Sequence, residues 1–145
     1  MNQIIFHIDV NSAYLSWTAV EQLKNGATED IREIPAIIGG NQESRHGIVL
    51  AKSVPAKRYG IVTGEPVAHA LRKCPEIKIY PPNHRMYDEY SARLMDFLSN
   101  YTPDIEQMSV DECYMDFTGI AHRFHSPVDA AFEIKEAVKI GRAHV

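Results

Sequence analysis

Three carboxylates stand where apolar segments end, in a pattern that suits a divalent cation. Asp9 follows the apolar-rich run from Ile4 to Ile8, and the adjacent pair Asp111 and Glu112 comes directly after Val110. Mg²⁺ prefers oxygen ligands in near-octahedral geometry and is usually held by a few carboxylates together with substrate phosphates. Two such ions, about 4 Å apart, stabilise both the attacking and the leaving oxygen of an in-line displacement. The pattern therefore predicts phosphoryl or nucleotidyl transfer.

Each of these carboxylates, taken alone, also fits a purely structural role, because acidic residues often end strands as solvated turn residues. Successive residues of a regular strand face opposite sides of a sheet. Asp111 and Glu112 can therefore share a metal only where a turn or bulge interrupts the strand. The metal hypothesis requires a hairpin at this position.

Three segments resemble, in order and spacing, the motifs of Y-family translesion DNA polymerases, and the bacterial polymerase IV-like and SOS-mutagenesis branch is the most similar. The segments are Asp9 to Tyr14, Gly47 to Gly60 and Ser109 to Asp116. The resemblance extends from Ile4 to about Lys139, and its most specific part is the Ser-Val-Asp-Glu tetrapeptide. It implies a template-directed DNA polymerase of the translesion and DNA-repair type, which transfers a nucleotidyl group from a deoxynucleoside triphosphate to a primer 3′-hydroxyl.

The resemblance also implies roles for individual residues. Asp9 and Asp111 would bridge two Mg²⁺ ions, which Mn²⁺ can replace, and Glu112 would bind the ion that activates the primer hydroxyl. The backbone carbonyl of Val10 would be a further ligand. Tyr14 falls on the steric-gate position, where an aromatic ring excludes the 2′-hydroxyl of a ribonucleotide; simple packing in the first turn of a helix is the alternative reading of this tyrosine.

Backbone amides and two cations are the expected contacts to the triphosphate. The amides of Asn11, Ser12 and Ala13 are predicted at a helix N-terminus, whose partial positive charge suits phosphate oxygens. Where many family members have Tyr-x-Ala-Arg, this chain has Val54 to Lys57. Lysine neutralises phosphate as a point charge but lacks the bidentate fork of arginine. Arg58 is the alternative cation if the register differs by one residue.

Composition and charge set the wider limits. The 145 residues are 45% hydrophobic, enough for a real core in one or two small domains. The net charge is −4, yet the segment from Ser44 to Lys73 contains six Lys and Arg residues and only one acidic residue. This basic segment fits either a triphosphate clamp or a solvated face. No apolar run approaches the roughly 20 residues of a membrane span, so we expect a cytoplasmic protein with Cys74 and Cys113 as reduced thiols.

Hydrophobic periodicity predicts an α+β fold. The predicted strands are 3–10, 35–39, 47–51, 77–80 and the hairpin 105–108 with 113–117; the predicted helical segments are 13–24, 55–59, 66–74, 85–99 and 127–139. On the helix 85–99, apolar side chains recur at helical spacing and predict a core stripe of Tyr87, Tyr90, Leu94 and Leu98. On the last helix the expected core face is Val128, Ala131, Ile134 and Val138. This order suggests an incomplete ferredoxin-like polymerase palm, residues 1–10 and 80–139, with a small fingers subdomain, residues 11–79, inserted after the first strand.

Two further expectations concern the C-terminal tail and the binding partners. Residues 140–145 resemble the translation of a sequencing-adapter oligonucleotide, so we interpret them as artefactual and the chain as an N-terminal fragment without its last palm strand. The implied partners are primer-template DNA, deoxynucleoside triphosphates and a sliding clamp reached through a missing C-terminal region. The fragment alone is expected to be inactive.

Two other functions fit the same scaffold. The first is a non-catalytic module that binds nucleic acid or protein. In such a module, Val54 and Lys57 would be ordinary sequence variation without a functional role. A palm-class cyclase is disfavoured because Gln107 to Val110 contains no glycine, whereas those enzymes use a Gly-rich hairpin between their central strands.

Overall fold

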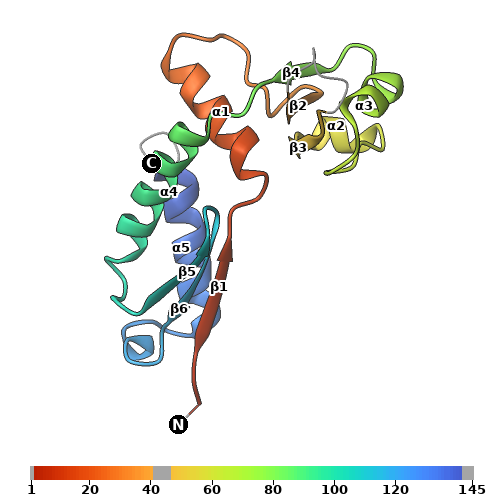
Figure 1. Cartoon of the computed structure of the whole chain (residues 1–145). Helices are drawn as coiled ribbons and strands as arrows, with labels where there is room; N and C mark the ends of the chain where they lie inside the picture. The colour runs from red at the N-terminus through yellow and green to blue at the C-terminus, as the bar shows by residue number, and fades with distance from the viewer. Residues whose placement is uncertain (1, 41–46, 142–145) are drawn as a thin grey trace. The chain divides into compact units, whose positions relative to one another are not determined.

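The computed structural model of the chain describes residues 2–40 and 47–141. It divides into two compact units: unit 1 joins Met1–Val10 to Arg85–Val145, and unit 2 is Asn11–His84. Figure 1 labels the helices and strands of both units. Each unit combines helices with a small sheet, so the predicted α+β class is confirmed.

Unit 1 is built on a three-stranded antiparallel sheet in the order β1-β6-β5. Its elements are β1 (Ile5–Asp9), α4 (His84–Leu98, which starts at the last residue of unit 2), β5 (Ile105–Ser109), β6 (Glu112–Asp116), the short 3-10 helix η1 (Ala121–Arg123) and α5 (Pro127–Gly141). Exposure alternates from residue to residue along β1 and β6, which is typical of a sheet that has one face against a core.

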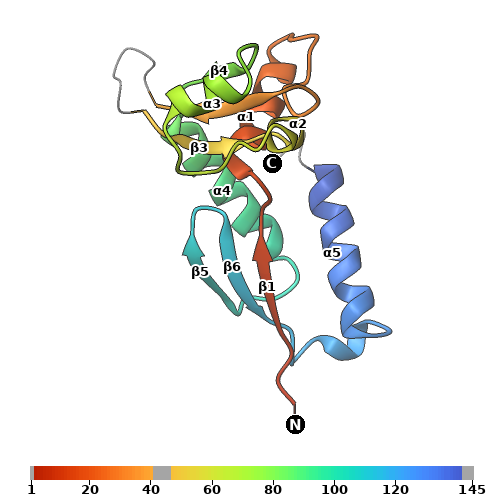
Figure 2. The same ribbon diagram turned by 90° about the vertical axis from the view of Figure 1, so that its right-hand side faces the viewer.

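Helices α4 and α5 cover the same face of this sheet, as Figure 2 shows. The core between them combines Leu94 and Leu98 of α4, Ala130 and Ile134 of α5, and, from β6 and just after it, Cys113, Met115 and Phe117. The stripe predicted for α4 is confirmed, because Tyr87, Tyr90, Leu94 and Leu98 are all buried.

The face predicted for α5 is partly wrong. Ile134 is buried and Val138 packs against the core, but Val128 is 76% exposed and Ala131 is also exposed. The helix instead faces the sheet through Ala130, Ile134 and Val138, which are spaced four residues apart. Apolar residues lie on more than one side of this helix, so periodicity alone did not select the side.

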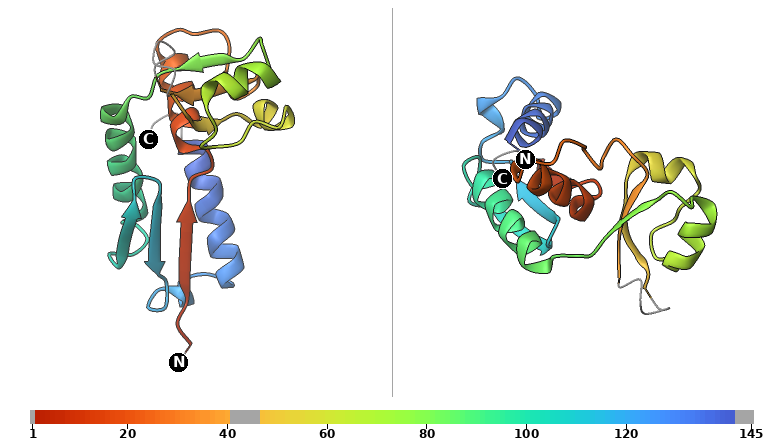
Figure 3. Two further views of the ribbon diagram at one scale, coloured as in Figure 1. Left: turned by 45° about the vertical axis from the view of Figure 1, so that its right-hand side comes forward. Right: turned by 90° about the horizontal axis from the view of Figure 1, so that it is seen from above.

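Unit 2 has three layers around a sheet in the order β3-β2-β4. Its elements are α1 (Ala13–Lys24), β2 (Ala36–Gly39), β3 (Val49–Lys52), α2 (Val54–Arg58), α3 (Val67–Lys73) and β4 (Lys78–Tyr80). The central strand β2 is buried on both faces. Ile37 faces α2 and α3, whereas Ala36 and Ile38 face α1. Figure 3 shows these layers from two further directions.

Several other sequence expectations can be compared with the structure. Cys74 and Cys113 are both free thiols, as predicted, and the structure buries both of them. Within residues 2–40 and 47–141, none of the helices has the length and apolar character that crossing a membrane requires. Helix α5 continues to Gly141, two residues beyond the predicted end at Lys139. The remainder of the supposed artefactual tail, 142–145, lies outside the described residues.

Candidate active site

The face of the unit 1 sheet opposite α4 and α5, here called the open face, collects polar side chains from β1 and β6. Directly paired residues of antiparallel strands share a face, and the face alternates along the strand. Asp9 pairs with Glu112 and His7 with Tyr114, so these four side chains lie on the open face. The sheet thereby places one carboxylate from each strand next to the other.

The hairpin that the metal hypothesis requires is present. β5 ends at Ser109 and β6 begins at Glu112, which leaves Val110 and Asp111 as the turn. The pairing register shifts between Gln107 and Ser109, as at a β-bulge. Since Asp111 lies in the turn, strict alternation does not force its side chain away from that of Glu112. The amide of Val10 donates to the Asp111 carbonyl, 3.0 Å, and ties the end of β1 to this turn.

Two neighbouring side chains contact the acidic pair. The Ser109 hydroxyl lies 2.9 Å from Asp111 Oδ1 and 3.1 Å from Glu112 Oε2. Its single hydrogen can be donated to only one of these oxygens at a time. His7 Nε2 lies 3.1 Å from Glu112 Oε1, and the imidazole ring stacks on Tyr114. Sequence reasoning missed His7, Ser109 and Tyr114.

The three carboxylates interact electrostatically. The pKa of Asp9 is raised above its ordinary value, chiefly by burial and then by the negative charges of Asp111 and Glu112, while His7 opposes the rise. Like charges held close together disfavour ionisation in this way. Burial and the two acids of the hairpin therefore shift the pKa of Asp9 in the same direction.

The donor chemistry fits a hard divalent cation, since all three candidate ligands are carboxylates. In the part of the chain that the structure describes, however, no three His, Cys, Asp or Glu side chains are close enough together to hold a metal ion as they stand. Repulsion between carboxylates favours such separation when no cation is bound, and the Glu112 oxygens are engaged by His7 and Ser109. Binding would require rotation of these side chains about a backbone arrangement that already exists.

The segment after β1 belongs to unit 2 and contains a backbone feature that the sequence did not predict. Ser12 precedes α1 with φ 47° and ψ 49°, the left-handed region, and its side chain makes no capping hydrogen bond. Ser12 is therefore the helix N-cap in position only. Instead the Ser16 hydroxyl donates to the Asn11 carbonyl, 3.4 Å. Ala13, the first residue of α1, is buried.

Tyr14 lies in the first turn of α1 and is half-buried. It packs against the core cluster that includes Leu15 and Ala19, and its ring meets His84 edge-on, with 5.9 Å between centroids. Packing thus accounts for part of this ring, while the rest remains accessible. Its predicted place beside an incoming sugar stays a prediction.

Lys57 and Arg58 occupy the last turn of α2, and both are exposed. Ser53 starts this helix: its hydroxyl accepts from the Ala56 amide, 3.1 Å, and donates to the Ile34 carbonyl, 2.7 Å. No ion pair or side-chain hydrogen bond holds either cation within the described part of the chain. A buried serine therefore anchors a short helix that presents two unpaired cations.

Other lysines of the basic segment make hydrogen bonds within unit 2. Lys73 bonds to Glu65, 2.7 Å, and to the Gly60 carbonyl, 2.8 Å, and Lys52 donates to Thr63, 3.0 Å. The Lys73 contact lowers the pKa of Glu65. Arg45 lies outside the described residues. Lys57, Arg58 and the exposed Arg72 are thus the cations of this segment best suited to meet a phosphate.

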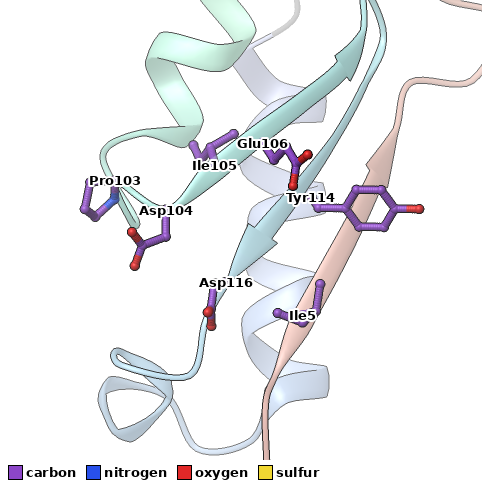
Figure 4. A pocket seen from close by; sticks show the side chains of 7 residues that line it. All are labelled: Ile5, Pro103, Asp104, Ile105, Glu106, Tyr114 and Asp116. Carbon is purple, nitrogen blue, oxygen red and sulfur yellow. The ribbon is translucent and has the colours of Figure 1, made fainter.

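A shallow hollow of about 510 Å³ marks the other end of the open face. Figure 4 shows its lining: Ile5, Pro103, Asp104, Ile105, Glu106, Tyr114 and Asp116. Ile5 pairs with Asp116, and it lies two residues along β1 from His7 and four residues from Asp9. Tyr114 therefore borders the hollow and also supports the His7 ring. No sequence motif pointed to this hollow.

Comparison with known proteins gives a consistent result. The impB/mucB/samB family (IMS) matches residues 8–141. "DNA polymerase IV" of Clostridium acetobutylicum is 55% identical over 139 residues, which are 96% of this chain and 35% of that protein. "DNA polymerase IV" of Alkaliphilus oremlandii is 41% identical over 139 residues, 96% of this chain and 33% of that protein. The chain thus spans about a third of the length of these relatives.

Solved structures share the fold. The Y-family DNA polymerase chimera Dbh-Dpo4(243-245)-Dbh superposes with a TM-score of 0.78 at 20% identity, covering 92% of this chain and 38% of that chain. A structure described as a Dbh ternary complex gives 0.75 at 21% identity, covering 92% of this chain and 37% of that chain.

Proposed function

Because the chain belongs to the impB/mucB/samB family of Y-family DNA polymerases, we propose that it is the palm and fingers part of a translesion polymerase of the polymerase IV type. Unit 1 corresponds to the palm and unit 2 to the fingers. The reaction is nucleotidyl transfer from a deoxynucleoside triphosphate to a primer 3′-hydroxyl. The observation that carries the proposal is the pairing of Asp9 with Glu112 beside the Asp111 turn.

In this proposal the carboxylates of unit 1 hold two Mg²⁺ ions. Asp9 and Asp111 supply shared ligands, Glu112 a ligand for the ion next to the primer hydroxyl, and the Val10 carbonyl a further oxygen. When bound, the ions lower the cost of the negative charge that develops on the attacking and leaving oxygens. Because the acidic side chains lie at one end of the open face, the ions would be held there.

The residues of unit 2 bind the nucleotide. The amides of Asn11, Ser12 and Ala13 offer donors to phosphate oxygens at the start of α1. Lys57 and Arg58, both exposed and unpaired, add positive charge. Tyr14 presents the accessible part of its ring to the sugar and excludes the 2′-hydroxyl. Primer-template DNA, a sliding clamp and a cytoplasmic location belong to the same proposal for the whole polymerase.

Metal binding by the chain itself tests this proposal. We expect isothermal titration calorimetry to detect saturable Mg²⁺ binding, and Asp111→Asn to weaken it at least about tenfold, or about 1.4 kcal/mol. Asp88→Asn is the matched control, because Asp88 is an exposed acid on α4. Equal Mg²⁺ affinity for wild type and Asp111→Asn would favour the alternative, a non-catalytic binding module on the same fold.

A further inference from the structure

Both oxygens of the Glu112 carboxylate are engaged by side chains from different strands. Oε1 lies 3.1 Å from His7 Nε2 on β1, and Oε2 lies 3.1 Å from the Ser109 hydroxyl on β5. A carboxylate only accepts hydrogen bonds, so Nε2 is the ring nitrogen that carries a hydrogen in this contact. The flexible glutamate is thus held from both sides of β6.

The His7 ring is itself held in place. It lies over Tyr114 with 4.7 Å between ring centroids and an interplanar angle of 21°. His7 and Tyr114 are directly opposite each other in the β1–β6 pairing, whereas Glu112 is the diagonal neighbour of His7. Cross-strand and diagonal neighbours of this kind interact in antiparallel sheets. The stack restrains the ring whose Nε2 lies 3.1 Å from Glu112 Oε1.

We propose that His7 is a positioning residue which, supported by the Tyr114 ring, holds the Glu112 carboxylate opposite Asp9 in readiness for a divalent cation. This inference rests on the function proposed above and adds to it a determinant of metal affinity. Metal-ligating side chains are commonly oriented by a hydrogen bond from a neighbour, and loss of that neighbour typically lowers metal affinity 10- to 100-fold.

The hydrogen bonds leave Glu112 able to bind a cation. An ionised carboxylate has about four lone-pair sites, and the contacts with His7 and Ser109 use at most two. His7 therefore restricts the rotamers of Glu112 without consuming its capacity as a ligand. The side chains of His7 and Glu112 are 44% and 37% exposed, so we expect an effect at the lower end of the usual range.

The test is Mg²⁺ titration of the 145-residue chain by calorimetry, repeated with Mn²⁺ by electron paramagnetic resonance. His7→Leu should weaken binding of both ions about tenfold. His7→Gln should restore most of the affinity, because its amide nitrogen can reach the place of Nε2 and donate to Glu112. His122→Leu, an exposed histidine on η1, should bind like wild type.

The Tyr114 variants provide an independent arm that leaves His7 intact. Tyr114→Phe preserves the stack and should bind normally, whereas Tyr114→Leu should weaken binding in the same direction as His7→Leu. Thermal unfolding in chelator identifies any variant that has lost its fold. Unchanged or tighter metal binding by folded His7→Leu and Tyr114→Leu would overturn the inference.

The Asp111→Asn result separates failure of this inference from failure of the proposed function. If Asp111→Asn weakens metal binding and the His7 and Tyr114 variants do not, the metal site stands and the positioning role is wrong. If wild type shows no saturable binding, or Asp111→Asn binds like wild type, the metal site itself is wrong and the positioning role falls with it.

Discussion

The Asp9 carboxyl group shows how the acidic cluster affects the stability of the chain. Its pKa is raised by burial and by Asp111 and Glu112, so the folded state binds this proton more tightly than the unfolded state. The stabilisation from Asp9 is therefore complete below its unfolded pKa, near the ordinary value of 3.8 for an aspartate, and is lost as the pH rises through the higher folded pKa. At neutral pH the ionised carboxylate opposes folding when no cation is present.

Asp9→Asn should consequently raise the melting temperature at pH 7 in chelator, because it removes the charge that Asp111 and Glu112 repel. The difference from wild type should shrink as the pH falls toward 3.8. Melting curves across this pH range measure the effect, with Asp88→Asn as the control for a simple change of net charge. A gain that is equal at all pH values would contradict the electrostatic explanation.

Tyr14 gives a prediction about sugar selection. Tyr14→Ala should increase ribonucleotide incorporation, because the ring that would clash with a 2′-hydroxyl is removed, while Tyr14→Phe should keep the discrimination. The assay is primer extension with ribonucleotides and deoxynucleotides, in a chain extended by the C-terminal region of the Clostridium acetobutylicum relative. Equal ribonucleotide incorporation by wild type and Tyr14→Ala would leave Tyr14 with packing as its role.

At the scale of elements, α1 lies between two residues in the left-handed region. Ser12 precedes it with φ 47°, and Gly26 follows it with φ 96°. The left-handed conformation costs a residue with a Cβ roughly 1–2 kcal/mol of conformational free energy, whereas glycine adopts it at little cost. The chain therefore uses the suitable residue after the helix and a strained one before it.

Ser12→Gly should stabilise the chain by about 0.5–1 kcal/mol, because the relief of strain exceeds the extra entropy of the unfolded chain. Gly26→Ala is the matched opposite and should destabilise it by about 1 kcal/mol. A Cβ added at Gly26 would meet nothing within 4 Å, so only backbone conformation is tested there. Urea denaturation gives both values, and a destabilised Ser12→Gly would refute the strain argument.

Some elements were predictable from sequence because only one orientation of the element buries its apolar residues. The hairpin around Asp111 and the apolar stripe of α4 are examples, since only one placement buried their apolar residues. The core face of α5 was not, because Val128, Ala130 and Ala131 offer competing apolar sides. The left-handed Ser12 was missed because serine rarely adopts this conformation.

Sequence motifs pointed to the three carboxylates of the candidate site, but they gave no role to Ser109 or Tyr114, although both lie within the segment from Ser109 to Asp116. His7, Ser109 and Tyr114 depend on which residues of β1, β5 and β6 stand opposite each other, and a sequence does not state that register. One signal was available: His7 is two residues before Asp9, so on a strand both share a face.

For the whole molecule, we expect the 145-residue chain alone not to extend a primer, although it carries the three carboxylates. Affinity for DNA comes largely from Lys and Arg that neutralise phosphates. This chain has a net charge of −4, and Lys73, within its basic segment, is bonded to Glu65. Binding to primer-template should therefore be weak and should fall steeply with added salt.

A second physical reason is the position of β1. Within the described residues it is an edge strand of the sheet, and Ile5 on it is 48% exposed. An unpaired apolar edge invites association with other chains, which would compete with DNA at the strand that carries Asp9. Ile5→Lys should reduce this association in light scattering without altering Mg²⁺ affinity.

Primer extension with Mg²⁺ and the four deoxynucleotides tests the main prediction, with the chain extended by the relative's C-terminal region as the positive control. The extended chain should synthesise DNA. It should lose this activity with Asp111→Ala, because Asp111 is a proposed metal ligand in the extended chain as in the 145-residue chain. Robust extension by the 145-residue chain, also abolished by Asp111→Ala, would contradict the prediction. It would mean that the chain holds primer-template DNA with the Lys and Arg residues that it already has.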